Sequence, residues 1–189
     1  MDPFSDILEM VEVKSSVYFQ KDFCAPWRMH VADTGFAQFH IIVRGEAVVD
    51  HDGGHDHVST GDIILFPKGA GHHIGDRIDS PEMRGQEVIH SLSQGEQPFA
   101  NGGRPTRMVC GHFEYDFDYR HPLIQEFPDV ILLRAANLPA GNHLQGLVNL
   151  IVRESRDMPV GSRVVLRRLS DALLVICLLY TSPSPRDRG

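Results

Sequence analysis

The sequence predicts a mainly β fold of the α+β class, in which a small barrel or sandwich of strands is followed by two helices. Short apolar segments separated by Gly-rich turns fill residues 11–113, which is typical of the strands of such a barrel. Two longer segments after residue 142 carry apolar residues at helical spacing instead. Strands followed by helices favour the α+β arrangement, with the helices segregated to one end.

The composition limits the class of protein. The chain of 189 residues is 42% hydrophobic and 23% charged, which suits one globular domain with an appendage. The formal charge of −7 argues against a basic surface, so we expect no direct binding of DNA by these residues. The cysteines Cys24, Cys110 and Cys177 are widely spaced and odd in number, which favours a reducing compartment. Because no bilayer-spanning or secretory segment is evident, we expect a cytoplasmic protein without membrane contact.

The strands are expected where short apolar runs end at turn residues. A short amphipathic helix precedes them over Asp2–Met10. The polar stretch Ser80–Pro105 is expected to be a long loop crossed by a strand near Val88. The strands themselves are expected over Val11–Phe19, Trp27–Ala32, Phe36–Val43, Glu46–His51, Asp62–Phe66, Gly71–Gly75 and Arg107–Phe113.

The helical part follows a short helical turn at His121–Pro128 and an apolar segment over Asp129–Leu133. Asn142 is the expected N-cap of a helix over His143–Arg156, and a second helix begins at Ser162. A barrel with its own core leaves these helices little to cover. We therefore expect them to form a homodimer, with packing on their own domain as the alternative.

The segment Gly61–His73, GDIILFPKGAGHH, combines a strand, a tight turn and a second strand. The first strand must stop at Pro67, which cannot donate to a ladder, and the chain turns through Gly69 and Gly71. His72 and His73 then fall on opposite faces of the next strand, so only one of them points inward.

This spacing resembles the second motif of the cupin superfamily. The resemblance implies a cupin double-stranded β-barrel (jelly roll), in which the histidine at the place of His72 faces the interior and is often a metal ligand. The chain as a whole resembles the regulatory half of AraC-type transcription regulators, which implies a barrel that binds an effector, a helical segment that dimerises, and a separate DNA-binding half that is missing here. The matching marks are Asp2-Pro3, Pro26-Trp27, Phe39-His40, Arg44-Gly45, Gly61-Asp62, Pro67 with Gly69 and His72, Cys110-Gly111, His121-Pro122-Leu123 and Arg168-Leu169-Ser170-Asp171.

A metal-binding cupin usually also carries a first motif with two histidines and a glutamate. Counting back from Gly45 places Gln38 where that glutamate belongs, and His40 shares its face. The strand before offers only His30, with Arg28 on the same face, while Trp27 is expected to line the pocket mouth or to fill the core. The expected ligand-binding residues are therefore Trp27, Arg28, His30, Gln38, His40, His72 and Cys110.

The same residues set a limit on metal chemistry. Zinc could be held by nitrogen and sulfur donors such as His40, His72 and Cys110. Gln38 is a poor ligand for first-row metals and the histidine pair is incomplete, so we expect no catalytic centre but a polar pocket for a small molecule. Cys110 is as readily a packing residue as a ligand. The His55-Asp56-His57 run has ligand-like spacing, yet we interpret it as a solvated turn.

These observations favour a non-enzymatic sensor module of a transcription regulator, with a small metal-dependent cupin enzyme of the dioxygenase or isomerase type as the alternative. We divide the chain into a barrel domain at 1–128, a helical linker and dimerisation segment at 129–176, and a tail at 177–189. Cys177–Asp187 matches one reading frame of a transposase adapter used in shotgun sequencing. We therefore expect residues after Ile176 to be non-native and to project without packing.

Overall fold

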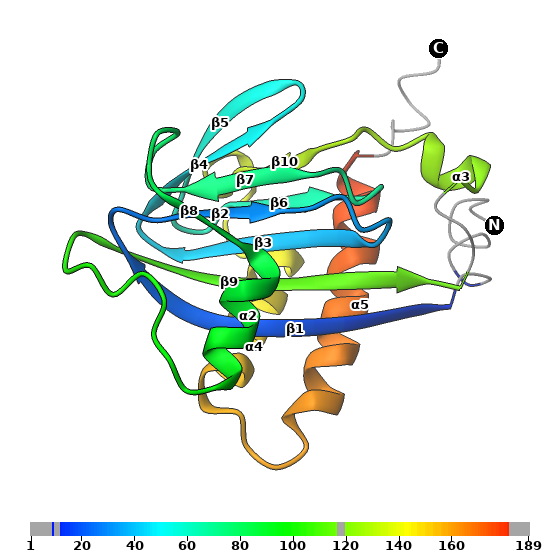
Figure 1. Ribbon diagram of the computed structural model, residues 1–189. Helices are drawn as coiled ribbons and strands as arrows, with labels where there is room; N and C mark the ends of the chain where they lie inside the picture. The colour runs from blue at the N-terminus through cyan, green and yellow to red at the C-terminus, as the bar shows by residue number, and fades with distance from the viewer. Residues whose placement is uncertain (1–8, 10–11, 117–119, 182–189) are drawn as a thin grey trace.

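Two sheets of five strands lie face to face and form the barrel (Figure 1). The structure is a computed structural model that describes residues 9, 12–116 and 120–181. Sheet A has the strand order β1-β9-β3-β6-β10, and sheet B has the order β5-β4-β7-β2-β8. The strands are β1 (Val13–Cys24), β2 (Arg28–Val31), β3 (Ala37–Arg44), β4 (Glu46–His51), β5 (Gly54–Ser59), β6 (Ile63–Phe66), β7 (His72–Gly75), β8 (Glu82–Arg84), β9 (Pro105–Tyr115) and β10 (Ile131–Leu133). This arrangement confirms the predicted jelly roll followed by helices.

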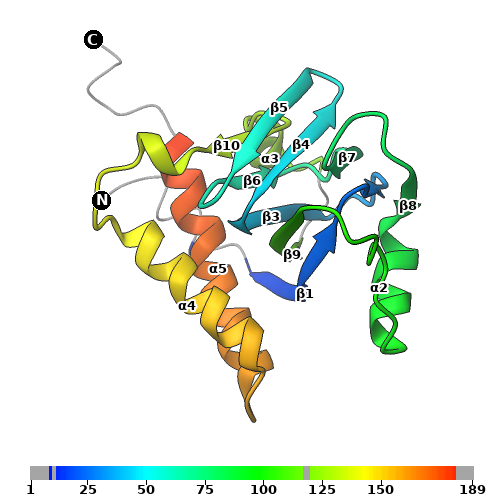
Figure 2. The ribbon, with the colours of Figure 1, turned by 90° about the vertical axis from the view of Figure 1, so that its left-hand side faces the viewer.

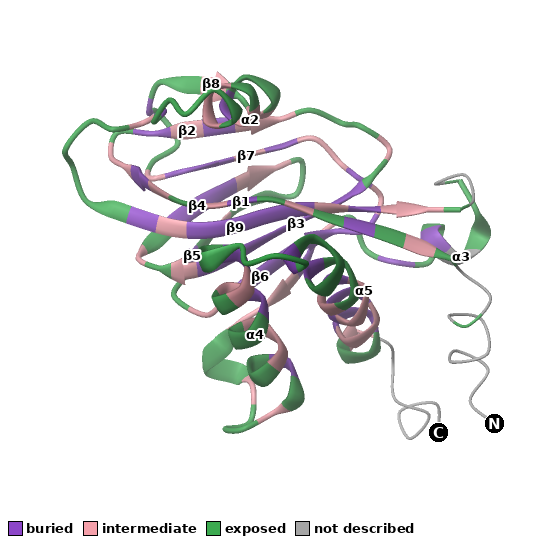
Figure 3. Cartoon of the chain, turned by 90° about the horizontal axis from the view of Figure 1, so that it is seen from below, coloured by how far each residue is buried: buried purple, intermediate pink, exposed green. Residues whose placement is uncertain are grey.

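The barrel core lies between the inner faces of the two sheets. Alternation along each strand sends one set of apolar side chains inward, and each fully buried one stabilises the fold by about 1.5–3 kcal/mol. Ile42 and Met108 of sheet A are fully buried in the same cluster as Ile74 of sheet B. Figure 3 shows how buried segments alternate with more exposed ones along the strands.

The outer face of sheet A is covered by two helices, α4 (His143–Asp157) and α5 (Ser162–Thr181). Phe39 and Ile41 point to this side and form a second buried cluster with Leu144, Ile151 and Leu173. Figure 2 shows α4 and α5 lying together against sheet A, with α2 at the other side of the barrel. The expectation that the helices have little of their own domain to cover is therefore wrong. β3 is buried on both faces, and its run of apolar residues reflects this.

The predicted strand, turn and strand over Gly61–His73 are present. β6 stops before Pro67, and Gly69 has a φ of 73° at a point where a Cβ atom would lie 2.5 Å from the carbonyl oxygen of Phe36. Only glycine fits there without a clash. The turn delivers His72 to the interior, where it is 2% exposed, as strand alternation predicts.

Two segments differ from the sequence predictions. The residues around Val88 form a helix, α2 (Gly85–Ser93), because Val88 and Leu92 lie one turn apart and Glu87 caps the backbone N–H of Arg84. His55-Asp56-His57 lies on β5, paired along its length with β4, and is not a turn. Of the expected Asp2–Met10 helix, only Glu9 lies within the described residues.

The helical region begins with the short α3 (Pro122–Gln125), β10 and a 3₁₀ turn over Ala135–Asn137. Asn142 caps α4 as predicted, accepting a hydrogen bond from the backbone N–H of Gln145 at 2.9 Å. Among the described helices, none is long and apolar enough to cross a membrane.

The end of α5 corrects the prediction that residues after Ile176 pack on nothing. Cys177 and Leu178 are each 1% exposed within the cluster on sheet A. They follow Leu173 and Leu174 by one turn, so the apolar stripe of the helix continues through them. Leu179 and Tyr180 are exposed at 46% and 44%, and residues 182–189 of the expected tail lie outside the described part of the chain.

Candidate functional site

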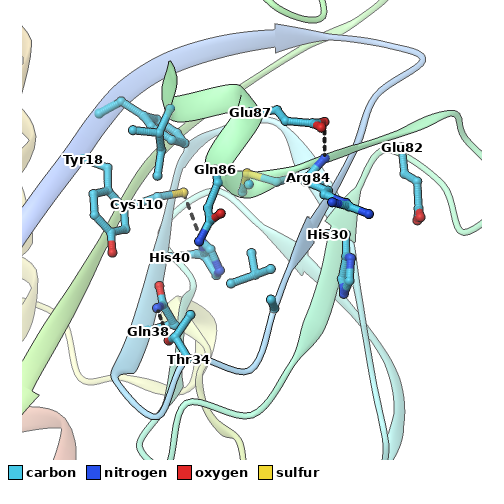
Figure 4. Close-up of a pocket in the computed structure, with 16 residues that line it drawn as sticks. Tyr18, His30, Thr34, Gln38, His40, Glu82, Arg84, Gln86, Glu87 and Cys110 are labelled. Atoms are coloured by element: carbon cyan, nitrogen blue, oxygen red, sulfur yellow. Dashed lines mark hydrogen bonds between the residues drawn. The ribbon is translucent and has the colours of Figure 1, made fainter. Parts of the chain in front are cut away.

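A cavity of about 590 Å³ lies between the barrel and α2 (Figure 4). One wall comes from the inner faces of β1, β3 and β9, and the other from β2, β8 and the first turns of α2. The wall mixes apolar and hydrogen-bonding groups, as ligand-binding pockets do. Its lining residues are Tyr18, Phe19, Met29, His30, Val31, Ala32, Thr34, Gln38, His40, Glu82, Arg84, Gly85, Gln86, Glu87, Ile89 and Cys110.

His40 and Cys110 line the cavity and form a hydrogen-bonded row with His72, which lies behind His40 and is not among the lining residues. Nδ1 of His40 lies 2.9 Å from Sγ of Cys110, and Nε2 of His40 lies 2.7 Å from Nε2 of His72. The ring of His72 also stacks on Phe66, with centroids 3.6 Å apart and planes at 5°. Strand pairing fixes this geometry, because His40 and Cys110 are direct partners across β3 and β9. The sequence prediction that Gln38, His40 and His72 face the same interior agrees with their positions.

The hydrogen bonds among Cys110, His40 and His72 allow one consistent assignment of donors and acceptors. Nδ1 of His72 lies 2.9 Å from the carbonyl oxygen of Ala70, which can only accept, so this nitrogen donates and Nε2 of His72 accepts. Nε2 of His40 must then donate to His72, and Nδ1 of His40 accepts from the thiol of Cys110. Both ring nitrogens of His40 and both of His72 are thereby hydrogen-bonded.

Burial keeps all three groups neutral. Removal from water lowers the pKa of His40 well below its usual value, and the nearby His72 lowers it further. Burial also lowers the pKa of His72 to about 4, against the opposing effect of the Ala70 carbonyl. The pKa of Cys110 is raised for the same reason, so the thiol stays protonated. The inner end of the cavity therefore offers polar but uncharged groups at neutral pH.

This arrangement does not fit a metal shared by His40 and His72. Two ligand nitrogens on a tetrahedral zinc lie about 3.3 Å apart, whereas these two are hydrogen-bonded at 2.7 Å. Their other nitrogens are already bound, to Sγ of Cys110 and to the carbonyl oxygen of Ala70. The donor geometry favours the hydrogen-bonded chain over the metal site that the family resemblance suggested.

Tyr18 and Gln38 supply further hydrogen-bonding groups to the cavity wall. Nε2 of Gln38 donates to Oγ1 of Thr34 at 3.1 Å. Burial raises the pKa of Tyr18 to about 12 in spite of its interaction with Gln38, so the phenol remains a donor. Tyr18 was missed at the sequence level because it sits at a register shift between Val17 and Phe19 in the β1–β9 pairing. Recognition of α2 as a helix would have pointed to the residues that it contributes.

Two predicted site residues lie elsewhere. Trp27 is fully buried in the core, with its ring 5.3 Å from that of Phe23 and 6.2 Å from that of Phe99. It is not among the residues that line the cavity. Arg28 also stays outside the lining and binds Asp50 at 3.0 Å. Of the two alternatives for Trp27, the structure has the core position.

His30 is placed differently from the interior position expected for it. It pairs with His73 across β2 and β7, while Val31 pairs with His72. Cross-strand partners share a face, so His30 points to the outer side of sheet B with His73. It still contributes to the cavity lining, at the end that lies next to Glu82 and β8 (Figure 4). The prediction that His30 faces the interior is thus wrong. A shift of one residue in the register of β2 reverses the face of each side chain, so Val31 and not His30 lies opposite His72.

The chain is similar to two regulators of transcription. It is 23% identical over 186 residues to an uncharacterized HTH-type transcriptional regulator of Haemophilus influenzae, covering 95% of this chain and 59% of that protein. It is 27% identical over 186 residues to the HTH-type transcriptional regulator MtrA of Neisseria gonorrhoeae, covering 94% of this chain and 58% of that one. The chain thus spans less than two thirds of the length of either relative.

Both relatives are named as regulators of transcription, and neither name describes an enzyme. A more distant likeness is to the solved structure of YhaK from Escherichia coli, with 12% identity, a TM-score of 0.34, and coverage of 66% of this chain and 40% of that one. That score is too low to add to the fold described above. The family model described as cupin matches residues 2–180, which is nearly the whole sequence. The jelly roll of the two sheets agrees with this match. The chain belongs to the cupin family.

Proposed function

We propose that this chain is the effector-sensing and dimerisation module of an AraC-type transcription regulator. The observation that carries the proposal is the cavity of about 590 Å³, whose wall includes Cys110 and His40, which are hydrogen-bonded to each other and, through His40, to His72 behind the wall. A volume in this range holds one small ligand. The relatives named above support a regulatory role, and we place this module in the cytoplasm.

The lining defines the chemistry of the ligand. Phe19, Met29 and Ile89 provide apolar contact, while Tyr18 and Gln38 provide hydrogen bonds. The inner end carries no charge, and a charged ligand there would lose its hydration without an ion pair in return. We therefore propose a small, uncharged polar or aromatic molecule as the effector.

Strand β1 links the cavity to the helices. Tyr18 and Phe19 line the cavity, while residues on the other face of the same strand bind α4 and α5. Oγ of Ser15 lies 2.7 Å from Oδ1 of Asp171 on α5, and Nε2 of Gln20 donates to the carbonyl oxygen of Val152 on α4 at 2.7 Å. A ligand that favours one position of β1 would thereby bias the helices, provided that it binds the two states with different affinity.

The helices also present a surface for a second copy of this chain. Leu150, Val164 and Val165 remain exposed although most other apolar residues of α4 and α5 are covered. We place the homodimer contact here and leave DNA recognition to the part of such regulators that this chain does not span. A Val164→Arg variant should shift the mass measured by light scattering from dimer to monomer. A wild-type monomer at high concentration would refute the dimer contact.

Binding of small uncharged aromatic probes tests the sensing proposal directly. Phenol, benzyl alcohol and indole should each be titrated by calorimetry into the wild type and into Ile89→Trp, which fills the cavity from α2. We expect at least one probe to bind the wild type and to lose at least about tenfold in affinity in that variant. Ile78→Trp, at an exposed position outside the cavity lining, is the matched control. Equal binding by all three proteins would refute the cavity as the sensing site.

A further inference from the structure

A second group of histidines lies on the outer face of sheet B. His30 on β2 and His73 on β7 are direct partners, and their rings stack with centroids 4.6 Å apart and planes at 18°. Glu82 on the neighbouring β8 places its Oε2 atom 3.2 Å from Nε2 of His73. One donor atom from each residue lies within 4.8 Å of the other two. Three adjacent strands therefore bring three donors to one point of the surface.

We propose that His30, His73 and Glu82 bind a divalent transition metal ion, with zinc as the best fit. Two imidazoles and one carboxylate suit zinc, which takes nitrogen ligands at about 2.0–2.1 Å and oxygen ligands at about 2.0–2.2 Å. The corresponding separation between two ligands in a tetrahedron is about 3.3 Å. The 3.2 Å between His73 and Glu82 already matches this separation. Among the described residues, no other group of three or more histidine, cysteine or acidic side chains meets the same condition.

The geometry around His73 suits a shared cation. Its ring has a carboxylate oxygen of Glu82 within 3.2 Å and the imidazole of His30 stacked on it, so two kinds of metal ligand already face it. Arg28 is itself bound to Asp50 at 3.0 Å, so its charge is balanced beside the site. Asp50 is also the strand partner of His73.

This site is distinct from the metal position of the cupin motif. His72 and His73 are consecutive on β7, and alternation sends the first to the interior and the second to the outer face. Glu82 is half exposed, so a bound ion would remain in contact with water. Both His30 and Glu82 line the outer end of the cavity, which puts the ion at the cavity rim (Figure 4). With three protein ligands, one coordination position stays open to water.

Zinc titration by calorimetry, on untagged 189-residue protein stripped of metal, tests this site. We expect one equivalent of zinc to bind the wild type, and affinity to fall at least about tenfold in both His73→Ala and Glu82→Gln. His90→Ala removes an exposed histidine of α2 and should bind zinc like the wild type. Cobalt should give the visible bands of a low-coordinate site without a thiolate charge-transfer band, because Cys110 is not a ligand.

Three results would overturn the proposal. They are no zinc binding by the wild type, unchanged affinity in both His73→Ala and Glu82→Gln, or a thiolate band with cobalt. Circular dichroism of the metal-free variants separates lost ligands from lost folding. If His73→Ala does not fold, Glu82→Gln decides the question alone, because its side chain is 51% exposed and its isosteric change leaves the strand intact.

Discussion

The two histidines of β7 are neighbours in the chain but lie in opposite environments. His72 is 2% exposed, and both of its nitrogens are bound, one to His40 and one to the carbonyl oxygen of Ala70. The side chain of His73 is 29% exposed, stacks on His30 and faces the carboxylate of Glu82. The inner pair, His40 and His72, is buried with all ring nitrogens hydrogen-bonded. The outer pair, His30 and His73, keeps ring nitrogens available for a further partner. Strand alternation alone separates the two roles.

The largest expected difference between the faces follows from placing a charge at each position. His72→Asp buries a carboxylate among aromatic rings and removes the acceptor of His40, so it should lower the free energy of unfolding by about 3–5 kcal/mol. His73→Asp should cost less than about 1 kcal/mol, since water reaches that face. Urea unfolding of both variants measures the difference. Similar losses in the two variants would contradict the assignment of opposite faces.

The pH dependence of stability should also come from the inner pair. Folding lowers the pKa of His72 from 6.5 to about 4, and the pKa of His40 falls in the same direction. Below pH 6.5 the unfolded chain therefore binds more protons than the folded one. The contribution of His72 is fully present above pH 6.5 and should be lost as the pH falls from 6.5 towards 4, by on the order of 3 kcal/mol.

Urea unfolding between pH 7.5 and 4.5 measures this loss. His72→Gln removes one titrating group and should flatten the profile relative to the wild type. His90→Ala, at an exposed position of α2, should leave the slope unchanged and serves as the control. A wild-type slope that survives in His72→Gln would show that other groups govern the acid response.

Ligand binding should depend on the inner face and not on the outer one. Tyr18→Phe removes one hydrogen-bonding group from the cavity wall and should weaken binding of an aromatic alcohol by about three- to tenfold, the equivalent of about 0.5–1.5 kcal/mol. His73→Ala should leave that affinity unchanged when metal is absent. Calorimetry on both variants tests the separation. Stronger dependence on His73 than on Tyr18 would reverse our assignment of the two faces.

The smallest expected effect is the loss of the outer ring stack. His30→Ala removes the 4.6 Å contact with His73 at a half-buried position, so we expect a loss of about 0.5–1 kcal/mol in the metal-free protein. Thermal unfolding without zinc measures this loss. The same measurement with zinc should stabilise the wild type and leave the variant unchanged. A loss above about 2 kcal/mol would mean that His30 belongs to the core.

Part of the fold and of the candidate site could be predicted from local sequence. Pro67 and Gly69 fix a turn by steric rules, and the period of two on the strand that follows sends His72 and His73 to opposite faces. The same period puts Gln38 and His40 together. Asn142 identifies the start of α4, because its side chain accepts from a backbone N–H that the helix leaves unpaired.

The tertiary structure decided which of the predicted faces contact one another. Nothing near His30 in the sequence reveals that it pairs with His73, since the register of β2 depends on strands that are distant in the chain. The apolar stripe of α4 fits either a partner or its own sheet, and the outer face of β3 supplies the sheet. Short-range rules therefore determined most elements and the faces of β3 and β7, whereas long-range pairing decided which faces meet, because that choice depends on the area buried across the whole domain.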